Sequence, residues 1–540
     1  MGRGFERQAR TFAALTLLSR VTGFGRDAIL GRIFGAGPML DAFNVAFQFP
    51  SLFRKLFGEG ALSASFLPVY ARLDKDDPAV ARRFAGVMLA MVAIFLAGLA
   101  IAGEAILLWL SGLQLHSEFA LRLMMIMLPY MPLVCLVALM GAMLQVHGRF
   151  GPTAASPIIL NLCIMATAFI GSEWWESLGL GPSAGDRGPV ERVAWSVMVA
   201  GLLQLAVHLW ALRHHRVRAH LKLADDRHHV RGVVLRTLPM LLGLGVFQLN
   251  TFVDSLVASW QTMVGPTILG VPYPLREGSL TFLSYAQRLY EFPLGVFGLA
   301  VATAIFPALS RQAPDADAFA ATLRRGVRLV VFIGLPASAG LMLVAEPLTA
   351  VILQGGAFSA EDTRETAWIL LGYAGAVWAY SLNQVLVRAF SARGDSMTPV
   401  RIALGLVGLN LLLNVTLIWT PLRTAGLAWS TAICAIVQLA WLMRAIARRV
   451  GPADAAAPRI LDHEVRRSIL RSVLVTAAMA AATWAALRLL AHLPAEHGWW
   501  GSLATILILV GVGTVVVVAV ARLQRMPELA WAIGRADRPG

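Results

Sequence analysis

Long apolar runs recur along the whole chain, and they constrain its fold more than any other feature. Each run has about 18 to 25 residues, enough at ~1.5 Å per residue to cross the ~30 Å hydrocarbon core of a bilayer as a helix. Stretches such as IILNLCIMATAFI and GSLATILILVGVGTVVVVAV lack the alternating polarity of membrane-barrel strands. The runs therefore predict an all-α protein that crosses a membrane many times.

Composition and charge support this class and argue against a nucleic-acid-binding protein. Hydrophobic residues make up 57% of the 540 residues, and charged residues only 14%. The formal net charge is +15, but the positive residues gather in short loops on alternate sides of the runs, as the positive-inside rule describes. The three cysteines lie far apart in apolar runs and are expected to pack as small core residues.

Fourteen membrane spans fit the pattern. They are expected at 12–34, 41–70, 84–111, 121–146, 153–172, 193–212, 237–262, 279–308, 329–350, 366–390, 402–419, 425–445, 470–491 and 500–521. With the N-terminus in the cytoplasm, the basic loop 213–236 is also cytoplasmic. Because the count is even, both termini are expected on the cytoplasmic side.

The sequence also contains an internal repeat. AWSVMVAGLLQLAVHLWALRHHRV from 194 aligns with AWSTAICAIVQLAWLMRAIARRV from 428, and FPSLFRK at 49 corresponds to FPLGVFG at 292. Six spans separate the equivalents, so the two copies keep the same orientation, as in two-lobed secondary transporters. We expect two parallel six-helix lobes around a central cavity, at 1–222 and 223–450, followed by two additional helices within 451–540.

Ionisable residues are concentrated in the first two spans, where lipid exposure would be costly. They are Arg20, Arg26, Asp27, Arg32, Asp41, Arg54, Lys55 and Glu59. A charge at a helix centre costs about 2.5 to 3.5 kcal/mol on insertion scales, so these residues are expected to face a hydrated cavity or one another. For the residues near span ends, extension of the side chain to the membrane interface is the alternative.

Spacing indicates how these charges are arranged. Arg20 and Asp27 are seven residues apart and share a helix face, whereas Lys55 and Glu59 are four apart and can pair. In the second half, Arg288 and Glu291 lie three apart, just before the second FP dipeptide. Glycines at 23 and 25 and prolines at 50 and 68 are expected to interrupt the first two spans and let them bend.

The excess of arginine over carboxylate predicts an anionic guest. Guanidinium groups bind phosphate oxygens in a bidentate manner and remain charged in a partly dry cavity. Pyrophosphate or a carboxylate-bearing headgroup would fit best.

Three long motifs resemble the MurJ family of lipid II flippases, within the MOP superfamily of exporters. They are SRVTGFGRDAILGRIFGAG, DAFNVAFQFPSLFRKLFGEGALSASFLPV and SYAQRLYEFPLGVFGLAVATAIFP. The resemblance implies an inner-membrane transporter, not an enzyme, that moves the lipid-linked peptidoglycan precursor lipid II from the cytoplasmic to the periplasmic leaflet by alternating access. It also implies that the two C-terminal helices form a groove for the lipid tail.

The resemblance further assigns roles to individual residues. Substrate binding falls to Arg20, Arg26, Arg54 and Arg288, and gating or ion pairing to Asp27, Asp41, Lys55, Glu59 and Glu291. Asp254, Asn410, Asn414 and Ser430 match positions that form a sodium site in some members. However, Asn414 stands where those members have a carboxylate, and polar packing is an equal alternative. Coupling to sodium, to protons or to the membrane potential stays open, as do contacts with cell-wall synthesis machinery.

Two other functions compete with this interpretation. A MATE-like exporter of cationic drugs should have an acidic lumen rather than an arginine-rich one, whereas a flippase for another polyprenyl-linked glycan stays possible. A membrane enzyme acting on polyprenyl phosphates would need a compact acidic or metal-binding cluster at the membrane surface, and the sequence contains no clear candidate.

Overall fold

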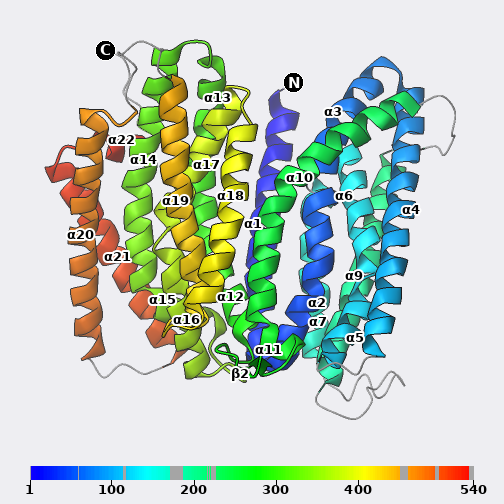
Figure 1. Ribbon diagram of the computed structural model, residues 1–540. Helices are drawn as coiled ribbons and strands as arrows, with labels where there is room; N and C mark the ends of the chain where they lie inside the picture. The colour runs from blue at the N-terminus through cyan, green and yellow to red at the C-terminus, as the bar shows by residue number, and fades with distance from the viewer. Residues whose placement is uncertain are drawn as a thin grey trace. The chain divides into compact units, whose positions relative to one another are not determined.

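The computed structural model describes residues 2–58, 60–112, 117–170, 187–215, 217, 219, 227–450, 460–492 and 498–533. Within these residues the chain is helical almost throughout (Figure 1). The sheet content described is one antiparallel hairpin of β1 (Thr267–Ile268) and β2 (Val271–Pro272), paired in the register Ile268 to Val271. The predicted all-α membrane class is confirmed.

The chain folds into two compact units. The first contains Met1–Thr281 and Gly355–Phe358, and the second contains Phe282–Gln354 and Ser359–Gly540. A four-residue loop from the second half of the sequence therefore belongs to the first unit. The lobe boundaries expected from the repeat, at 222 and 450, stay a prediction, as does the central cavity.

The first unit consists of helices that follow one another along the first half of the chain. They are α1 (Gly2–Phe34), α2 (Pro38–Phe53), the π-helix η1 (Arg54–Gly58), α3 (Ala61–Asp76), α4 (Pro78–Ser111), α5 (Glu118–Met127), α6 (Tyr130–Val146), α7 (Gly151–Phe169), α9 (Gly188–His214), α10 (Arg227–Ala258) and α11 (Trp260–Met263). Helix α10 begins at Arg227, so the loop that was expected at 213–236 ends earlier than predicted.

Helix α12 (Ser279–Pro293) starts in the first unit and continues into the second. The second unit then contains η2 (Leu294–Leu299), α13 (Ala300–Arg311), α14 (Ala316–Leu343), α15 (Ala345–Leu353), α16 (Ala360–Ala374), α17 (Val377–Ala392), α18 (Met397–Leu417), α19 (Ala425–Val450), α20 (His463–Ala491), α21 (Trp499–Leu523) and α22 (Pro527–Ala532).

Each of the fourteen expected spans overlaps helix. In the described residues, nine helical segments are long and apolar enough to cross a membrane by themselves. Most of the other expected spans carry several charges, as α1 does with its arginines, or are divided by a break, as between α2 and α3. The protein is therefore a multi-pass membrane protein.

Prolines interrupt the second and eighth expected spans in the same way. Helix α2 contains Pro50 and gives way to the π-helix η1, and α12 ends at Pro293 and gives way to the π-helix η2. Proline lacks an N–H group and crowds the preceding turn, which favours a local change of helical register. By contrast, α1 is one continuous helix, so the expected interruption at Gly23 and Gly25 was wrong.

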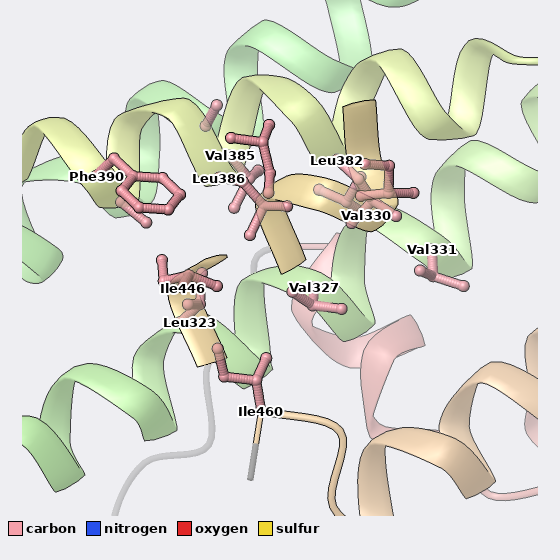
Figure 2. Close-up of a cluster of buried hydrophobic side chains, with 14 of the residues drawn as sticks. Leu323, Val327, Val330, Val331, Leu382, Val385, Leu386, Phe390, Ile446 and Ile460 are labelled. Atoms are coloured by element: carbon pink, nitrogen blue, oxygen red, sulfur yellow. The ribbon is translucent and has the colours of Figure 1, made fainter. Parts of the chain in front are cut away.

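Apolar side chains of α14, α17 and α19 pack together in the second unit. Figure 2 shows Leu323, Val327 and Val330 of α14 facing Val385, Leu386 and Phe390 of α17 and Ile446 of α19, with Ile460 beside them. The three α14 residues follow the spacing of one helix face. Because lipid tails are as apolar as these side chains, close packing rather than transfer from water holds such helices together.

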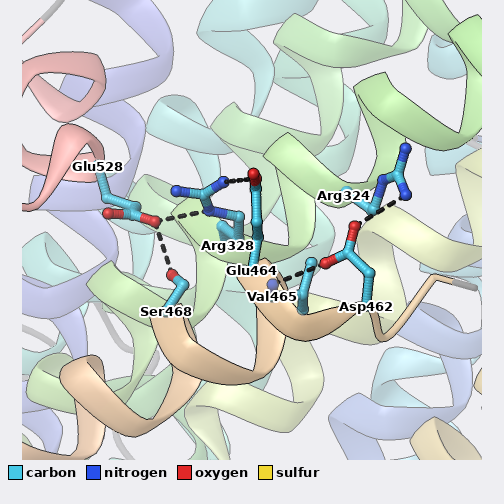
Figure 3. A network of polar contacts seen from close by, with 7 residues as sticks. All are labelled: Arg324, Arg328, Asp462, Glu464, Val465, Ser468 and Glu528. Carbon is cyan, nitrogen blue, oxygen red and sulfur yellow. Dashed lines mark hydrogen bonds and ion pairs between the residues drawn. The ribbon is translucent and has the colours of Figure 1, made fainter.

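A polar network joins the last helices to α14 (Figure 3). Glu528 of α22 is 1% exposed, and its Oε1 accepts hydrogen bonds from Arg328 Nε at 2.7 Å and from Ser468 Oγ of α20 at 2.6 Å. Arg328 also pairs with Glu464 at 3.3 Å and lies over the ring of Trp531, 5.1 Å from its centroid. The short helix α22 therefore connects α20 and α14 through one buried carboxylate.

A second ion pair lies beside this network, at the start of α20. Arg324 Nη1 of α14 donates to Asp462 Oδ2 at 2.8 Å, while Asp462 Oδ1 accepts from Val465 N at 2.8 Å and so caps α20. The two pairs hold the C-terminal helices against the rest of the second unit, although the predicted lipid-tail groove stays a prediction.

Candidate functional site

The charged residues of α1 form a compact cluster with one residue of α7. Arg26 donates to Asp27 Oδ1 through Nε at 2.9 Å and through Nη2 at 2.6 Å, and its Nη1 donates to Asn161 Oδ1 at 3.3 Å. The Arg26 and Asp27 side chains are only 11% and 10% exposed. Asp27 thus pairs with its neighbour Arg26.

The contacts of Arg26 leave part of its guanidinium available. Arginine carries five N–H donors, and these contacts engage Nε, one N–H of Nη1 and one N–H of Nη2. The other two N–H groups, one on each terminal nitrogen, have no partner among the described residues. Guanidinium N–H groups of this kind can donate to the oxygens of a phosphate or carboxylate.

Arg20 lies two turns before this cluster on α1 and is exposed. Arg54 and Lys55 are the first residues of η1, where Arg54 is half-buried and Lys55 exposed. Glu59, the expected partner of Lys55, lies outside the described residues. The roles of these residues stay predictions.

Asp41 of α2 is fully buried and binds the beginning of α12. Its Oδ1 accepts from Thr281 N at 2.8 Å and Thr281 Oγ1 at 2.7 Å, and its Oδ2 accepts from Gly278 N at 2.8 Å and Thr262 Oγ1 at 3.4 Å. Free N–H groups and the positive end of the dipole at a helix N-terminus favour a carboxylate. Among the described residues its partners are N–H and O–H groups, so Asp41 acts as a cap supplied by another helix rather than as a member of an ion pair.

Two neighbouring polar residues extend the contact made by α2. Asn44 Nδ2 donates to Thr281 Oγ1 at 3.1 Å, and Gln48 Nε2 donates to Ser255 Oγ of α10 at 2.7 Å. Asp41, Asn44 and Gln48 share one face of α2, since they lie three or four residues apart. This face links α2 to the start of α12 and to α10.

The loop Gly355–Phe358 docks on the end of α1. Ala357 N donates to the carbonyl oxygen of Arg32 at 2.7 Å, and Phe358 is 1% exposed. Gly356 has φ +57°, and a Cβ there would overlap the Arg32 carbonyl oxygen. Gly35 has φ +69°, and a Cβ there would lie 2.9 Å from Ala357 O. The close approach of the two backbones therefore depends on glycine.

The hairpin between α11 and α12 is fixed by two aromatic residues. Trp260 stacks on Tyr273 with 5.7 Å between ring centroids, and the Tyr273 hydroxyl donates to Val257 O at 2.8 Å. Burial raises the pKa of the Tyr273 hydroxyl. The hairpin leads directly to Gly278, so it helps to fix the segment that Asp41 caps.

The predicted residues of the second unit lie on α12. Arg288 and Glu291 are both exposed, and Tyr290 between them stacks on Tyr373 and Tyr380, with 4.5 and 5.5 Å between ring centroids. The tyrosine stack fixes the helix that carries the two charges. Convergence of Arg288 with the arginines of the first unit stays a prediction.

Three of the four predicted sodium ligands form a closed ring in the second unit. Asn410 Nδ2 donates to Ser430 Oγ at 3.2 Å, Asn414 Nδ2 donates to Asn410 Oδ1 at 2.9 Å, and Ser430 Oγ donates to Asn414 Oδ1. Each side-chain oxygen accepts one hydrogen bond within the ring, and none of the three side chains carries a formal charge. Asp254 is buried on α10 in the first unit. The sodium site stays a prediction, beside the alternative of polar packing.

Two features of the site were not predicted from the sequence. Asn161 is the single amide side chain in the apolar run IILNLCIMATAFI. It could have been predicted to contact another helix, since polar residues in spans often mediate such contacts. The Gly-Gly doublet at 355–356 was a weaker signal, because glycines in a loop are common and do not reveal what the loop contacts.

Comparison with known proteins gives consistent matches over most of the chain. A family model described as "Lipid II flippase MurJ" matches residues 30–507. A probable lipid II flippase of Vibrio cholerae is 33% identical over 452 residues, which cover 80% of this chain and 81% of the relative. A probable lipid II flippase of Haemophilus influenzae is 30% identical over 497 residues, 87% of this chain and 90% of the relative.

Solved structures show the same fold. A lipid II flippase in an inward closed conformation matches with a TM-score of 0.72 and 21% identity, covering 95% of this chain and 98% of that chain. An inward-facing multidrug resistance MATE transporter matches with a TM-score of 0.63 and 14% identity, covering 83% of this chain and 100% of that chain. At these identities the structural likeness concerns the fold alone.

Proposed function

This chain belongs to the lipid II flippase MurJ family, and from that membership we propose that it moves lipid II from the cytoplasmic to the periplasmic leaflet of the bacterial inner membrane. Both termini lie on the cytoplasmic side in this proposal, in accord with the basic loops on that side. The protein acts as a transporter, and its substrate is the undecaprenyl-diphosphate-linked disaccharide pentapeptide.

The observation that carries this proposal is the state of Arg26. Its side chain is mostly buried and held from two directions, yet one N–H donor on each terminal nitrogen has no partner among the described residues. A diphosphate offers several anionic oxygens that can accept hydrogen bonds from these two donors. A cationic drug, the cargo expected for a MATE-like exporter, would meet repulsion from Arg26 and Arg20. Another polyprenyl-linked glycan stays the closest alternative, because it would carry the same diphosphate.

Arg20, Arg54 and Arg288 join Arg26 in this proposal and share the charge of the headgroup. Arg20 and Arg288 are exposed and Arg54 is half-buried, so all three guanidinium groups are at least partly accessible to a guest. The helices α20 and α21 receive the lipid tail. Their outward faces are rich in exposed apolar side chains such as Leu474 and Val515, which suits an isoprenoid chain.

Two contacts within the first unit serve as gates in this proposal. The Asp41 cap holds the start of α12, and the docked loop Gly355–Phe358 holds the end of α1. Both α12 and the chain on either side of the loop continue into the second unit, so relative movement of the units pulls on these contacts. Alternating access then consists of making and breaking them, with Glu291 and Lys55 as further gating charges.

The driving force is proposed to be the membrane potential, with sodium as the alternative. Moving one charge across the membrane gains about 2.3 kcal/mol per 100 mV, and the substrate diphosphate is anionic. No step of the mechanism is assigned to a sodium ion, because the ring of Asn410, Asn414 and Ser430 is already internally hydrogen-bonded. Membership of the MurJ family is the reason for proposing components of the cell-wall synthesis machinery as partners.

Complementation of a strain depleted of its own lipid II flippase tests the proposal. Arg26→Ala should fail to support growth and should let lipid II accumulate in the cytoplasmic leaflet, whereas Arg26→Lys should rescue only in part because the fork is lost. The matched control is Arg466→Ala, which removes an exposed arginine of α20 and should complement fully. Growth of the Arg26→Ala strain with normal periplasmic lipid II would refute the proposal.

A further inference from the structure

Asn161 lies at the centre of the contact between α1 and α7. It is 5% exposed, and its Nδ2 donates to Thr22 Oγ1 at 3.1 Å and to Ser19 O at 3.3 Å, while its Oδ1 accepts from Arg26 Nη1 at 3.3 Å. Ser19, Thr22 and Arg26 follow one face of α1 at helical spacing. One amide therefore contacts two turns of that helix.

The surroundings fix the orientation of the Asn161 amide. Its two ends differ, because the oxygen only accepts and the nitrogen only donates. If the amide were turned over, its NH₂ group would face the Arg26 N–H, and its oxygen would face the Ser19 carbonyl. Both contacts would then be repulsive, so the acceptor is held toward Arg26.

The contact with Ser19 is not needed to satisfy that carbonyl. Ser19 O also accepts a hydrogen bond from Thr22 Oγ1 at 3.0 Å. Gly23 provides the space for the amide, since a Cβ at this position would lie 3.6 Å from Asn161 Nδ2. Apart from its hydrogen bond to Thr22 Oγ1, the distinctive feature of Asn161 is its contact with the Arg26 guanidinium.

Asn161 and Asp27 restrain Arg26 in different ways. Asp27 is the next residue of the same helix and engages Nε and Nη2, whereas Asn161 comes from α7 and engages Nη1. Together they occupy three N–H groups and leave one on each terminal nitrogen. An arginine side chain that is already ordered loses less conformational entropy when it binds an anion.

We propose that Asn161 is a positioning residue for Arg26, which it holds so that the two remaining N–H groups face the diphosphate of the substrate. The neutral amide orients the guanidinium without cancelling its positive charge. A second carboxylate would cancel that charge. This inference rests on the proposed function for the identity of the anion, but the orientation of Arg26 can be measured without transport.

The test uses purified full-length protein and two measurements. The first is the rate at which phenylglyoxal modifies Arg26, followed by peptide mass spectrometry, and the second is the affinity for geranyl diphosphate. In Asn161→Ala, Arg26 should react about 10-fold faster and the diphosphate should bind about 10-fold to 100-fold more weakly, the loss expected for a hydrogen bond to a charged group. The wild-type protein and Arg26→Ala calibrate both measurements.

A conservative variant separates positioning from a merely structural role. Asn161→Asp keeps an oxygen acceptor for Arg26, so phenylglyoxal reactivity should stay near the wild-type rate, while the added negative charge should weaken diphosphate binding. The matched control is Asn383→Ala, which removes a buried asparagine of α17 that donates to Ala435 O at 2.9 Å. Neither measurement should change in this control.

The outcomes distinguish the two proposals. If Asn161→Ala leaves both measurements at the wild-type level while Arg26→Ala abolishes diphosphate binding, the positioning role is refuted and the proposed function stands. If Arg26→Ala itself binds geranyl diphosphate normally, the diphosphate assignment fails. If Asn161→Ala does not fold, equal changes of both measurements in Asn161→Asp would refute positioning.

Discussion

Replacing Gly356 by alanine perturbs the loop that docks on the end of α1. Gly356 has φ +57°, and a Cβ there would overlap the carbonyl oxygen of Arg32. This carbonyl accepts the hydrogen bond from Ala357 N at 2.7 Å. Alanine can therefore be accommodated only if the loop moves away from α1 and gives up that hydrogen bond.

The size of the effect follows from the backbone strain at residue 356 and from the loss of the Ala357 hydrogen bond. A non-glycine residue in the left-handed region costs about 1 to 2 kcal/mol, and loss of one backbone hydrogen bond costs about 0.5 to 1.5 kcal/mol. The steric overlap adds to this sum, so the docked state should lose about 2 to 4 kcal/mol. At 1.4 kcal/mol for each factor of ten, the undocked population should rise roughly 30-fold to 700-fold.

Hydrogen exchange of the Ala357 amide measures this population directly. In protein reconstituted in nanodiscs, the Gly356→Ala variant should exchange this amide faster by the same factor. Gly394→Ala is the matched control, because Gly394 has φ +76° and a Cβ there meets no atom within 4 Å. It introduces the backbone strain without the overlap and should leave the Ala357 amide unchanged. An exchange rate in Gly356→Ala within about threefold of the wild-type rate would show that the loop is not held by this contact.

Three further predictions concern other contacts. Asp41→Asn replaces one acceptor oxygen by an NH₂ group and leaves buried donors of α12 unpaired, so thermal unfolding should show a loss of about 1 to 3 kcal/mol. Glu528→Gln replaces the buried carboxylate that pairs with Arg328, and limited proteolysis should then cleave near α22 faster, whereas unchanged cleavage would show that this ion pair does not hold α22 in place. Because burial raises the pKa of the Tyr273 hydroxyl, stability present below about pH 10 should fall as the pH rises further, and Tyr273→Phe should lack this loss in alkaline thermal melts.

Sequence reasoning predicted the helices well because membrane spans are specified locally. A run of about 20 apolar residues determines a helix whatever surrounds it, and all fourteen expected ranges overlap helix. The repeat was also informative in detail, since both FP dipeptides precede a π-helix. The continuity of α1 was missed because glycine lowers helix propensity only slightly, and the packing of α7 against α1 supports the helix at Gly23 and Gly25.

The site was predicted less completely, because partners far apart in sequence decide its geometry. The charge of Asp41 suggested an ion pair, but its partners are backbone N–H groups almost 240 positions further along the chain. Nothing local to Asp41 shows that a helix will begin beside it. Likewise, the sequence predicted Arg26 as a charge within the membrane, but its contact with Asn161 depends on how α7 packs against α1.

The π-helices η1 and η2 change the direction in which the residues after them face. A π-helical turn holds more residues than an α-helical turn, so side chains beyond each segment are rotated about the helix axis relative to an uninterrupted α-helix. Both segments follow a proline, Pro50 in one case and Pro293 in the other. The period of 3.6 residues therefore cannot be carried across either segment when one predicts which residues share a helix face.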